Sequence, residues 1–313
     1  MEFLEFDFKS IKLIGKINGF VPIYTILLLK DGRLVSCGED KSIRIYNAIN
    51  FQLENTIILH DKYINYITQL KNEKLVSCSL DNTMKIVKLN NDNSYTIEQI
   101  LTDHIFFVMK IIETHNGKLV SCSGDKTIKI WDLENKNNFY QCELTINVYK
   151  NSIDSIIEIP ENKEILSASN FGRKLFFFDI NNFNIKFIIS DISCCSFYPN
   201  SICILNNKLI GICGNLLFYI INYNIHKLTQ TFYMNGNCLT INKLLNGKIV
   251  VGERGCLKFF KIKDNYIQDE FTEDYIHDKE ITCIQNKNYN NKNLIITSSL
   301  DNSIKFFEEK QIN

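Results

Sequence analysis

The segment Lys118–Glu134, KLVSCSGDKTIKIWDLE, decides the fold of this chain. Two short alternating runs, Leu119–Ser123 and Thr127–Asp132, flank a tight Gly-Asp-Lys turn. Apolar residues at every second position on both sides of such a turn are typical of a β-hairpin. The same pattern recurs as LVSCGEDKSIRIYN at Leu34–Asn47, LVSCSLDNTMKIVK at Leu75–Lys88 and IITSSLDNSIKFFE at Ile295–Glu308.

These copies resemble the WD-repeat family. They share the order (Ser/Thr)-x-x-x-Asp-x-(Ser/Thr)-hydrophobic-(Lys/Arg)-hydrophobic, which an aromatic residue completes in all but the second copy. The third copy also keeps the Trp-Asp pair, Trp131-Asp132. The resemblance is specific because the pattern is repeated in a fixed order along the chain.

Equivalent apolar anchors recur 40 to 46 residues apart, at Leu34, Leu75, Leu119, Ile165, Leu209, Ile249 and Ile295. A period in the forties is what a four-stranded propeller blade requires. The fifth and sixth copies lack the Asp turn, but an Asn lies three residues before their anchors, as in other copies. Asn accepts the positive φ of a hairpin turn. We therefore predict an all-β, seven-bladed propeller of four-stranded antiparallel blades.

The last copy ends near Glu308 after its third strand, whereas a spare run, Ser10–Ile17, precedes the first copy. We predict that this N-terminal strand completes the last blade, since closure removes exposed sheet edges. Met1–Phe8 would extend that strand or pack beneath it. The whole chain, 1–313, then forms a single propeller, with blades at approximately residues 18–58, 59–102, 103–147, 148–191, 192–234, 235–275 and 276–313 plus 3–17.

Composition indicates an ordinary globular protein. The 313 residues are 45% hydrophobic and 22% charged, and 35 basic residues balance 35 acidic ones. This balance argues against general nucleic-acid binding. The longest apolar region, Leu209–Ile221, is too short to span a membrane. The start has no signal-peptide pattern.

Cysteine usage favours an intracellular chain, cytoplasmic or nuclear, with reduced thiols. Cys37, Cys78 and Cys122 occupy the same slot in three repeats, and Ala168 and Ser298 fill it elsewhere. Because this position in the repeat takes small residues, we predict that its cysteines are packed free thiols. The cysteines have no zinc-ligand spacing, so we expect no metal and no cofactor.

His104, Ser121 and Asp125 are the residue types of a catalytic triad. The resemblance to WD repeats instead implies a structural hydrogen-bonded chain that also includes Trp131. The set recurs in two further copies, and a catalytic centre needs only one. We therefore expect no enzyme activity, and assign the same structural role to His60, Ser77, Asp81, His277, Thr297 and Asp301.

Partners of WD-repeat proteins commonly bind on the face that carries the His loops and Asp turns. Residues that precede an inner strand, or lie beside the turn Asp, should point there. We predict contacts from Tyr63, Phe107, Leu80, Pro22, Glu280 and Leu300, although packing of Tyr63, Phe107 and Leu80 on their own loops explains these residues equally well. The segment Asn170–Lys174 lacks the Asp turn, which makes Phe171 and Arg173 candidate contacts. Sequence divergence without a functional role explains the missing turn equally well.

The sequence thus favours a non-catalytic scaffold or adaptor for a protein or peptide partner, monomeric within a larger complex. The alternative is a lipid- or phosphate-binding propeller, which requires a basic patch on one blade edge. The phosphoinositide-binding class carries Phe-Arg-Arg-Gly, whereas this chain has Glu253-Arg254-Gly255. A propeller enzyme with its site in the central channel is the less favoured third hypothesis.

Overall fold

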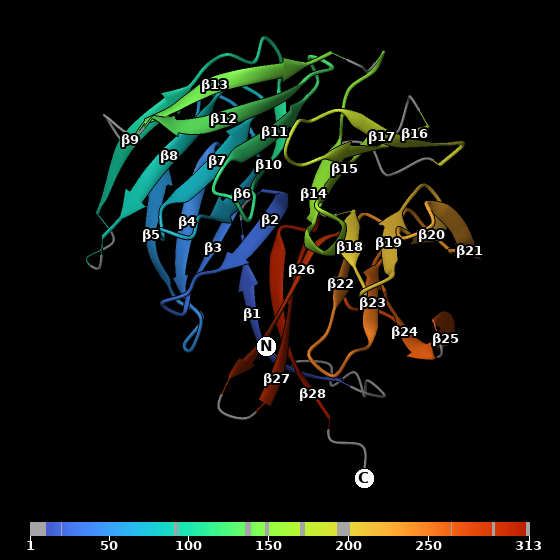
Figure 1. Cartoon of the computed structure of the whole chain (residues 1–313). Coiled ribbons are helices and arrows are strands. Elements are labelled where there is room, and N and C mark those ends of the chain that lie inside the picture. The colour runs from blue at the N-terminus through green and yellow to red at the C-terminus, as the bar shows by residue number, and fades with distance from the viewer. Residues whose placement is uncertain are drawn as a thin grey trace.

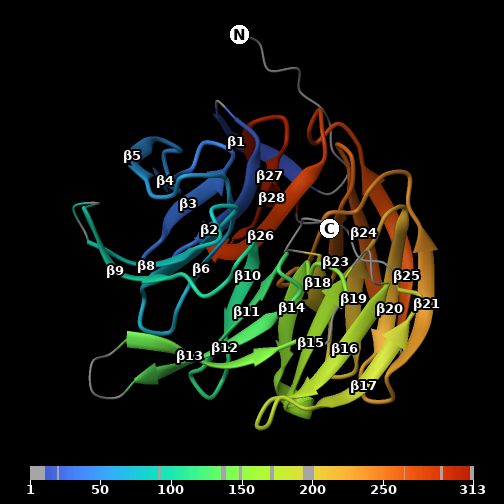
Figure 2. The same ribbon diagram turned by 90° about the horizontal axis from the view of Figure 1, so that it is seen from above.

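The structure, a computed structural model, describes residues 11–19, 21–90, 92, 94–134, 139–147, 150–169, 173–192, 201–263, 265–289 and 292–310. These residues form seven four-stranded antiparallel sheets arranged in a ring (Figure 1, Figure 2). The predicted all-β, seven-bladed propeller is confirmed.

In the first three blades, strands follow the chain from the centre of the ring outward. Blade 1 comprises β2 (Ile23–Leu28), β3 (Arg33–Gly38), β4 (Ser42–Asn47) and β5 (Leu53–Ile58). Blade 2 comprises β6 (Ile64–Gln69), β7 (Leu75–Ser79), β8 (Met84–Leu89) and β9 (Tyr95–Leu101). Blade 3 comprises β10 (Val108–Glu113), β11 (Leu119–Ser123), β12 (Ile128–Glu134) and β13 (Phe139–Ile146).

Blades 4 to 6 keep this order although their turn motifs have degenerated. Blade 4 comprises β14 (Ser155–Ile159), a short 3-10 turn η1 (Pro160–Asn162), β15 (Glu164–Ser169), β16 (Lys174–Asp179) and β17 (Ile185–Ser190). Blade 5 comprises β18 (Ile202–Ile204), β19 (Leu209–Cys213), β20 (Leu217–Asn222) and β21 (Lys227–Tyr233). Blade 6 comprises β22 (Thr240–Lys243), β23 (Ile249–Gly252), β24 (Leu257–Lys263) and β25 (Tyr266–Glu273).

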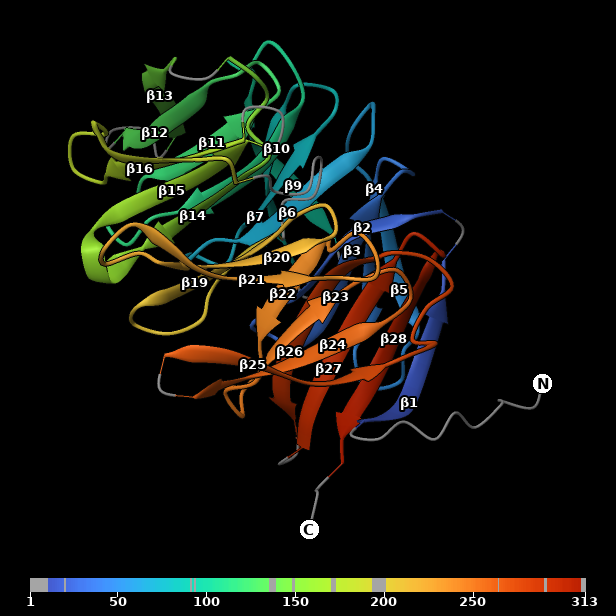
Figure 3. The same cartoon turned by 90° about the vertical axis from the view of Figure 1, so that its right-hand side faces the viewer.

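Blade 7 closes the ring with strands from both ends of the chain. It comprises β26 (Ile281–Tyr289), β27 (Lys292–Ser299), β28 (Ser303–Glu309) and β1 (Ile11–Asn18). Figure 3 shows β1 lying along β28, and the two strands pair from Ile11↔Glu309 to Asn18↔Ser303. The predicted closure by the N-terminal strand is confirmed, while Met1–Phe8 lies outside the described residues.

The hydrophobic core lies between neighbouring blades. Each blade packs a sheet face on the next, so β7, β11 and β19 are buried at every position. One cluster joins blades 3 and 4 through residues such as Ile130 and Phe178, and another joins blades 7 and 1 through Phe306 and Ile26. Face-to-face packing explains why Leu119 and Val120, which point to opposite faces of β11, are both fully buried.

Two strand boundaries differ from the sequence-based expectation. The apolar positions of Ile153–Ile159 predict an inner strand over this segment, but the strand begins at Ser155, because the Ile153 N–H donates to Ser123 O of the preceding blade at 3.1 Å. The polar segment Asn286–Asn293 predicts a loop from its sequence, but it is mostly strand, since Asn286 and Lys287 still pair with Ile295 and Leu294. Their polar side chains suggested a loop, but the hairpin ladder continues through them.

Candidate functional site

The polar set of blade 3 forms one continuous hydrogen-bonded chain. His104 Nδ1 lies 2.7 Å from Asp125 Oδ2, and Nε2 lies 2.8 Å from Ser121 Oγ. Trp131 Nε1 donates to the same hydroxyl oxygen at 2.9 Å. An ionised Asp125 places the imidazole proton on Nδ1, so Nε2 accepts the Ser121 hydroxyl proton. The chain therefore ties the loop, the turn and two strands together.

Blades 2 and 7 repeat this geometry. His60 lies 2.8 Å from Asp81 and 2.7 Å from Ser77 Oγ. His277 lies 2.9 Å from Asp301 and 2.8 Å from Thr297 Oγ1. The structure thus brings together every residue of the three predicted sets.

The turn aspartates are held in their ionised form. Burial raises the pKa of Asp125, but hydrogen bonds from His104 and Thr127 outweigh it and hold this pKa well below its usual range. Asp81 and Asp301 show the same net lowering of pKa, with Thr83 and Ser303 as second donors. Fully paired buried polar groups of this kind stabilise one conformation of the loop and the turn.

These triad-like hydroxyls are enclosed within the blades. Ser121 and Thr297 are 0% exposed, and Ser77 is 1% exposed. A nucleophile has to reach a substrate carbonyl, and these hydroxyls face the imidazole and the blade interior. The geometry therefore serves loop positioning, and the same geometry recurs in three blades.

The basic residues of the third strands also bind within the protein. Lys85 Nζ donates to Leu59 O at 2.7 Å, and Lys129 Nζ donates to Thr145 Oγ1 at 2.9 Å. Lys305 Nζ donates to Ile276 O at 2.5 Å, and Arg44 pairs with Asp40. Each is half-buried, so the recurrence of a basic residue at this position reflects structural pairing.

The structure joins the predicted partner-facing residues in pairs. In blades 1, 2, 3 and 7, the residue beside the turn Asp donates its N–H to the carbonyl of the residue before the inner strand. Leu80 N donates to Tyr63 O at 2.9 Å, and Leu300 N donates to Glu280 O at 3.1 Å. The other two bonds are Glu39 N to Pro22 O at 3.2 Å and Gly124 N to Phe107 O at 2.9 Å.

These predicted residues differ in exposure. Tyr63 is 39% exposed, whereas Leu80, Phe107 and Leu300 are half-buried. Phe107 packs against the core between blades 3 and 4. Pro22 and Glu280 are also half-buried, and Glu280 forms an isolated β-bridge with Arg254. Arg173 is exposed with a positive φ of 47°, and Phe171 lies outside the described residues.

Two exposed apolar residues of this face were not predicted from the sequence. Ile105 and Phe106, next to His104, are 82% and 51% exposed. The rings of Phe106 and Phe107 lie 4.5 Å apart over Gly124, where a Cβ would overlap Phe107 and lie 2.8 Å from Phe106 Cδ1. The signal was present in the sequence, since Ile105–Phe107 is an apolar run inside a loop.

A second aromatic contact lies on the same face, between blades 1 and 2. The rings of Tyr24 and Tyr63 meet edge to face at 6.4 Å, and the Tyr24 hydroxyl donates to Glu39 at 2.8 Å. We call Tyr24, Tyr63, Ile105, Phe106 and Phe107 the apolar arc. It follows the His-loop face across blades 1 to 3.

Blade 6 replaces the missing turn Asp with a different carboxylate. Glu253 is 3% exposed, and its Oε2 accepts the N–H groups of Asn235 and Gly236 at 2.9 and 3.1 Å. Asp81 and Asp125 accept loop N–H groups in the same manner in their own blades. Burial raises the pKa of Glu253. In blade 6, the carboxylate of Glu253 therefore holds the loop in place, from a different position in the repeat than the turn Asp of the other blades.

The described residues include no group of three or more His, Cys, Asp or Glu side chains arranged to hold a metal ion. The nine cysteines within this part are all free, and burial raises the pKa of Cys37 and Cys78. No helix among the described residues is long and apolar enough to cross a bilayer.

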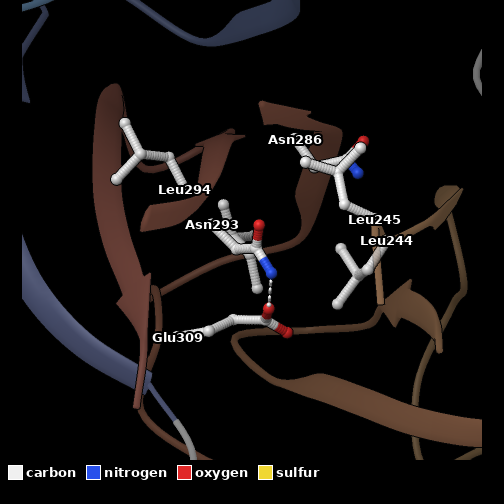
Figure 4. Close-up of a pocket in the computed structure, with 7 residues that line it drawn as sticks. Leu244, Leu245, Asn286, Asn293, Leu294 and Glu309 are labelled. Atoms are coloured by element: carbon white, nitrogen blue, oxygen red, sulfur yellow. Dashed lines mark hydrogen bonds between the residues drawn. The ribbon is translucent and has the colours of Figure 1, made fainter. Parts of the chain in front are cut away.

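Blades 6 and 7 form a small hollow at the end opposite the His loops, and hydrogen bonds join the polar side chains there (Figure 4). Glu309 accepts from Asn246 Nδ2 at 2.7 Å and from Asn293 Nδ2 at 2.9 Å. The space between these side chains has no room for a water molecule. It is lined by Leu244, Leu245, Asn286, Asn293, Leu294, Ile295 and Glu309.

A comparison with family models matches the WD domain, G-beta repeat, at residues 11–47, 96–132 and 272–308. Each matched segment starts in the outer strand of one blade, β1, β9 or β25, and ends at the third strand of the next blade. A search of curated proteins found no match. Propellers of this family are typically non-catalytic scaffolds for protein interactions. Three matched repeats within a closed ring of seven blades are consistent with a WD-repeat β-propeller.

Proposed function

We propose that this chain is a non-catalytic scaffold that binds a protein or peptide partner through the apolar arc. The observation that carries the proposal is the exposure of Ile105 and Phe106 on a loop fixed by the His104–Asp125 bond. Exposed aromatic side chains on rigid backbone are typical centres of binding energy, because little conformational entropy is lost on association.

The half-buried predicted residues would support this surface rather than dominate it. Leu80 and Phe107 hold the loops through the paired backbone bonds, and Tyr63 adds an exposed ring. Pro22, Glu280, Leu300, Arg173 and Phe171 are secondary candidates. The free thiols suit a reducing compartment inside the cell, where we expect a monomeric propeller within a larger complex.

Affinity capture with quantitative mass spectrometry from the source cell tests the proposal. The Tyr63→Ala/Phe106→Ala double variant should lose its specific partner, with recovery at least about tenfold lower. Leu53→Ala is the matched control, because Leu53 is 49% exposed at the start of the outer strand β5, at the end of the blade opposite the His loops. Equal recovery with the double variant and with wild type would place the binding site elsewhere.

A further inference from the structure

The outer strand of blade 4 has an unusual surface. In β17, Ile185, Phe187 and Ile188 are 40%, 42% and 42% exposed, and they project from both faces of the strand. Within the described part of the chain, β17 pairs with β16 on one side and with no strand on the other. Its free edge therefore offers backbone N–H and C=O groups beside apolar side chains. Sheet edges of this type are usually protected by charge, proline or a bulge.

Charge distinguishes this part of the rim from the rest. The outer strands β5, β9, β13 and β25 each carry at least one Asp or Glu, whereas β17 and β21 carry none. The strand β1 also lacks acids, but it exposes one large apolar side chain, Ile14. From residue 192 to residue 252 the sequence contains four lysines and no carboxylate side chain. Blade 5, next to β17, is therefore free of acidic residues although the whole chain is neutral.

The basic side chains gather around β17. Lys174, exposed on β16, pairs in register with Ser190 of β17. Lys186 lies 2.9 Å from Glu164, a carboxylate that is 2% exposed and also contacts His226 at 3.3 Å. Glu164 and Lys186 therefore compensate each other, and two further carboxylates lie nearby, Asp191 directly after β17 and Asp179 at the end of β16. Against these two carboxylates stand three exposed basic residues, Arg173, Lys174 and Lys227, so the surface keeps a small positive excess.

A side chain of blade 5 also fixes the position of Phe187, the central apolar residue of the β17 edge. The imidazole of His226, in the turn before β21, stacks on the Phe187 ring with centroids 4.7 Å apart and planes inclined by 22°. The same imidazole also meets the ring of Phe177 of β16 edge to face, with ring centroids 4.6 Å apart. The apolar edge is thus rigid, since Phe187 is held between two blades.

We propose that an extended, acidic and apolar segment of a partner protein adds to β17 as a fifth strand of blade 4. Backbone hydrogen bonds to the free edge would supply affinity, and alternating apolar side chains would meet Ile185, Phe187 and Ile188. Carboxylates of the segment would face Lys174 and Lys227, which favours an acidic partner over a basic one. This edge is separate from the apolar arc, which lies on the His-loop face of blades 1 to 3.

Fluorescence anisotropy with synthetic peptides tests strand addition. The probe is a labelled peptide of about eight residues that alternates valine and glutamate, a typical length for a strand. Its controls are the same peptide with lysine in place of glutamate, and one with proline at alternate positions, which cannot donate the ladder hydrogen bonds. We expect the full-length protein to bind the first peptide at least about tenfold more tightly than either control.

Protein variants locate the binding edge. Ile188→Glu and Lys174→Glu/Lys227→Glu should each weaken binding about tenfold or more, since they place negative charge opposite the acidic peptide. Ile97→Glu is the matched control, because Ile97 is 40% exposed on the outer strand β9. Unchanged binding by Ile188→Glu, or equal binding of the proline peptide, would overturn the proposal.

Two other results would also overturn it. Flotation with phosphatidylserine vesicles that is lost in Lys174→Glu/Lys227→Glu, without peptide binding, would assign the patch to an anionic membrane. Concentration-dependent dimers in sedimentation velocity that Ile188→Glu abolishes, again without peptide binding, would assign the edge to a second copy of the chain. Loss of peptide binding leaves partner capture by the apolar arc unaffected, so the two proposals fail independently.

Discussion

Replacing His104 by Ala removes the central member of the blade 3 hydrogen-bonded chain. The imidazole is 1% exposed and makes the bonds of 2.7 and 2.8 Å to Asp125 and Ser121. Its loss leaves the Ser121 hydroxyl proton without its acceptor, and leaves Asp125 Oδ2 with the more distant N–H of Ile105 at 3.2 Å. Each orphaned buried group costs about 1–3 kcal/mol, and the cavity adds to this cost. We expect His104→Ala to lower the free energy of unfolding by about 3–5 kcal/mol.

Urea titration followed by tryptophan fluorescence measures this effect where it arises. Trp131 is the single tryptophan, it is 1% exposed, and its indole donates to Ser121. His115→Ala is the matched control, because that side chain is 50% exposed and its pairing with Glu158 is worth at most about 1 kcal/mol.

A double-mutant cycle separates the hydrogen-bonded chain from the effect of the cavity. Combining His104→Ala with Ser121→Ala removes both partners of one bond, so the two losses should be non-additive by about 1–2 kcal/mol. Equal losses for His104→Ala and His115→Ala, or strictly additive losses in the cycle, would refute the structural role assigned to the polar sets.

Three further predictions concern turn strain, ring closure and pH. Lys126 has a positive φ of 73°, so Lys126→Gly should stabilise the protein by about 0.5–1 kcal/mol in urea titration; destabilisation would contradict the strain. Gly15→Ala places a Cβ into the Phe51 ring, so thermal unfolding should begin at least about 3 °C lower; an unchanged midpoint would show that this contact is loose. The pKa of His277 is lowered from 6.5 by burial, despite the opposing bond to Asp301, and that of Asp301 is lowered from 3.8. Because both values are depressed in the folded chain, stability should fall first below pH 6.5 and again below about pH 3.8, in urea titrations across pH. Constant stability from pH 7 to 5 would contradict the His277 contribution.

The fold was predictable because the repeat carries its own geometry. A central strand buried on both faces requires a run such as Leu119–Ser123, and its spacing sets the number of blades. The two degenerate blades were located from the spacing of their apolar anchors and from their Asn turns, at Asn206 and Asn246, whose side chains accept the N–H groups of Lys208 and Lys248. Asparagine turns persist there because they shape the hairpin itself.

The binding surface was less predictable, since it depends on loop conformation. Aligning the repeats selected Phe107, but its ring packs on the core, and the exposed member of the pair is Phe106. That outcome follows from the absence of a Cβ at Gly124, a contact between residues that the repeat pattern does not relate. The role of Glu253 was hidden for a similar reason, because its carboxylate acts from a shifted position in the turn. The exposed apolar edge of β17 was not predicted, because the alternation of residues along a strand does not tell which of them are exposed to solvent.

Hydrogen–deuterium exchange of the full-length protein, read by mass spectrometry, tests ring closure most directly. If Ile11–Asn18 is the outer strand of blade 7, its amides paired with Ser303–Glu309 should exchange as slowly as those of the inner pairs of that blade. Protection of β27 and β28 together with rapid exchange throughout Ile11–Asn18 would show that the N-terminal strand does not latch the ring.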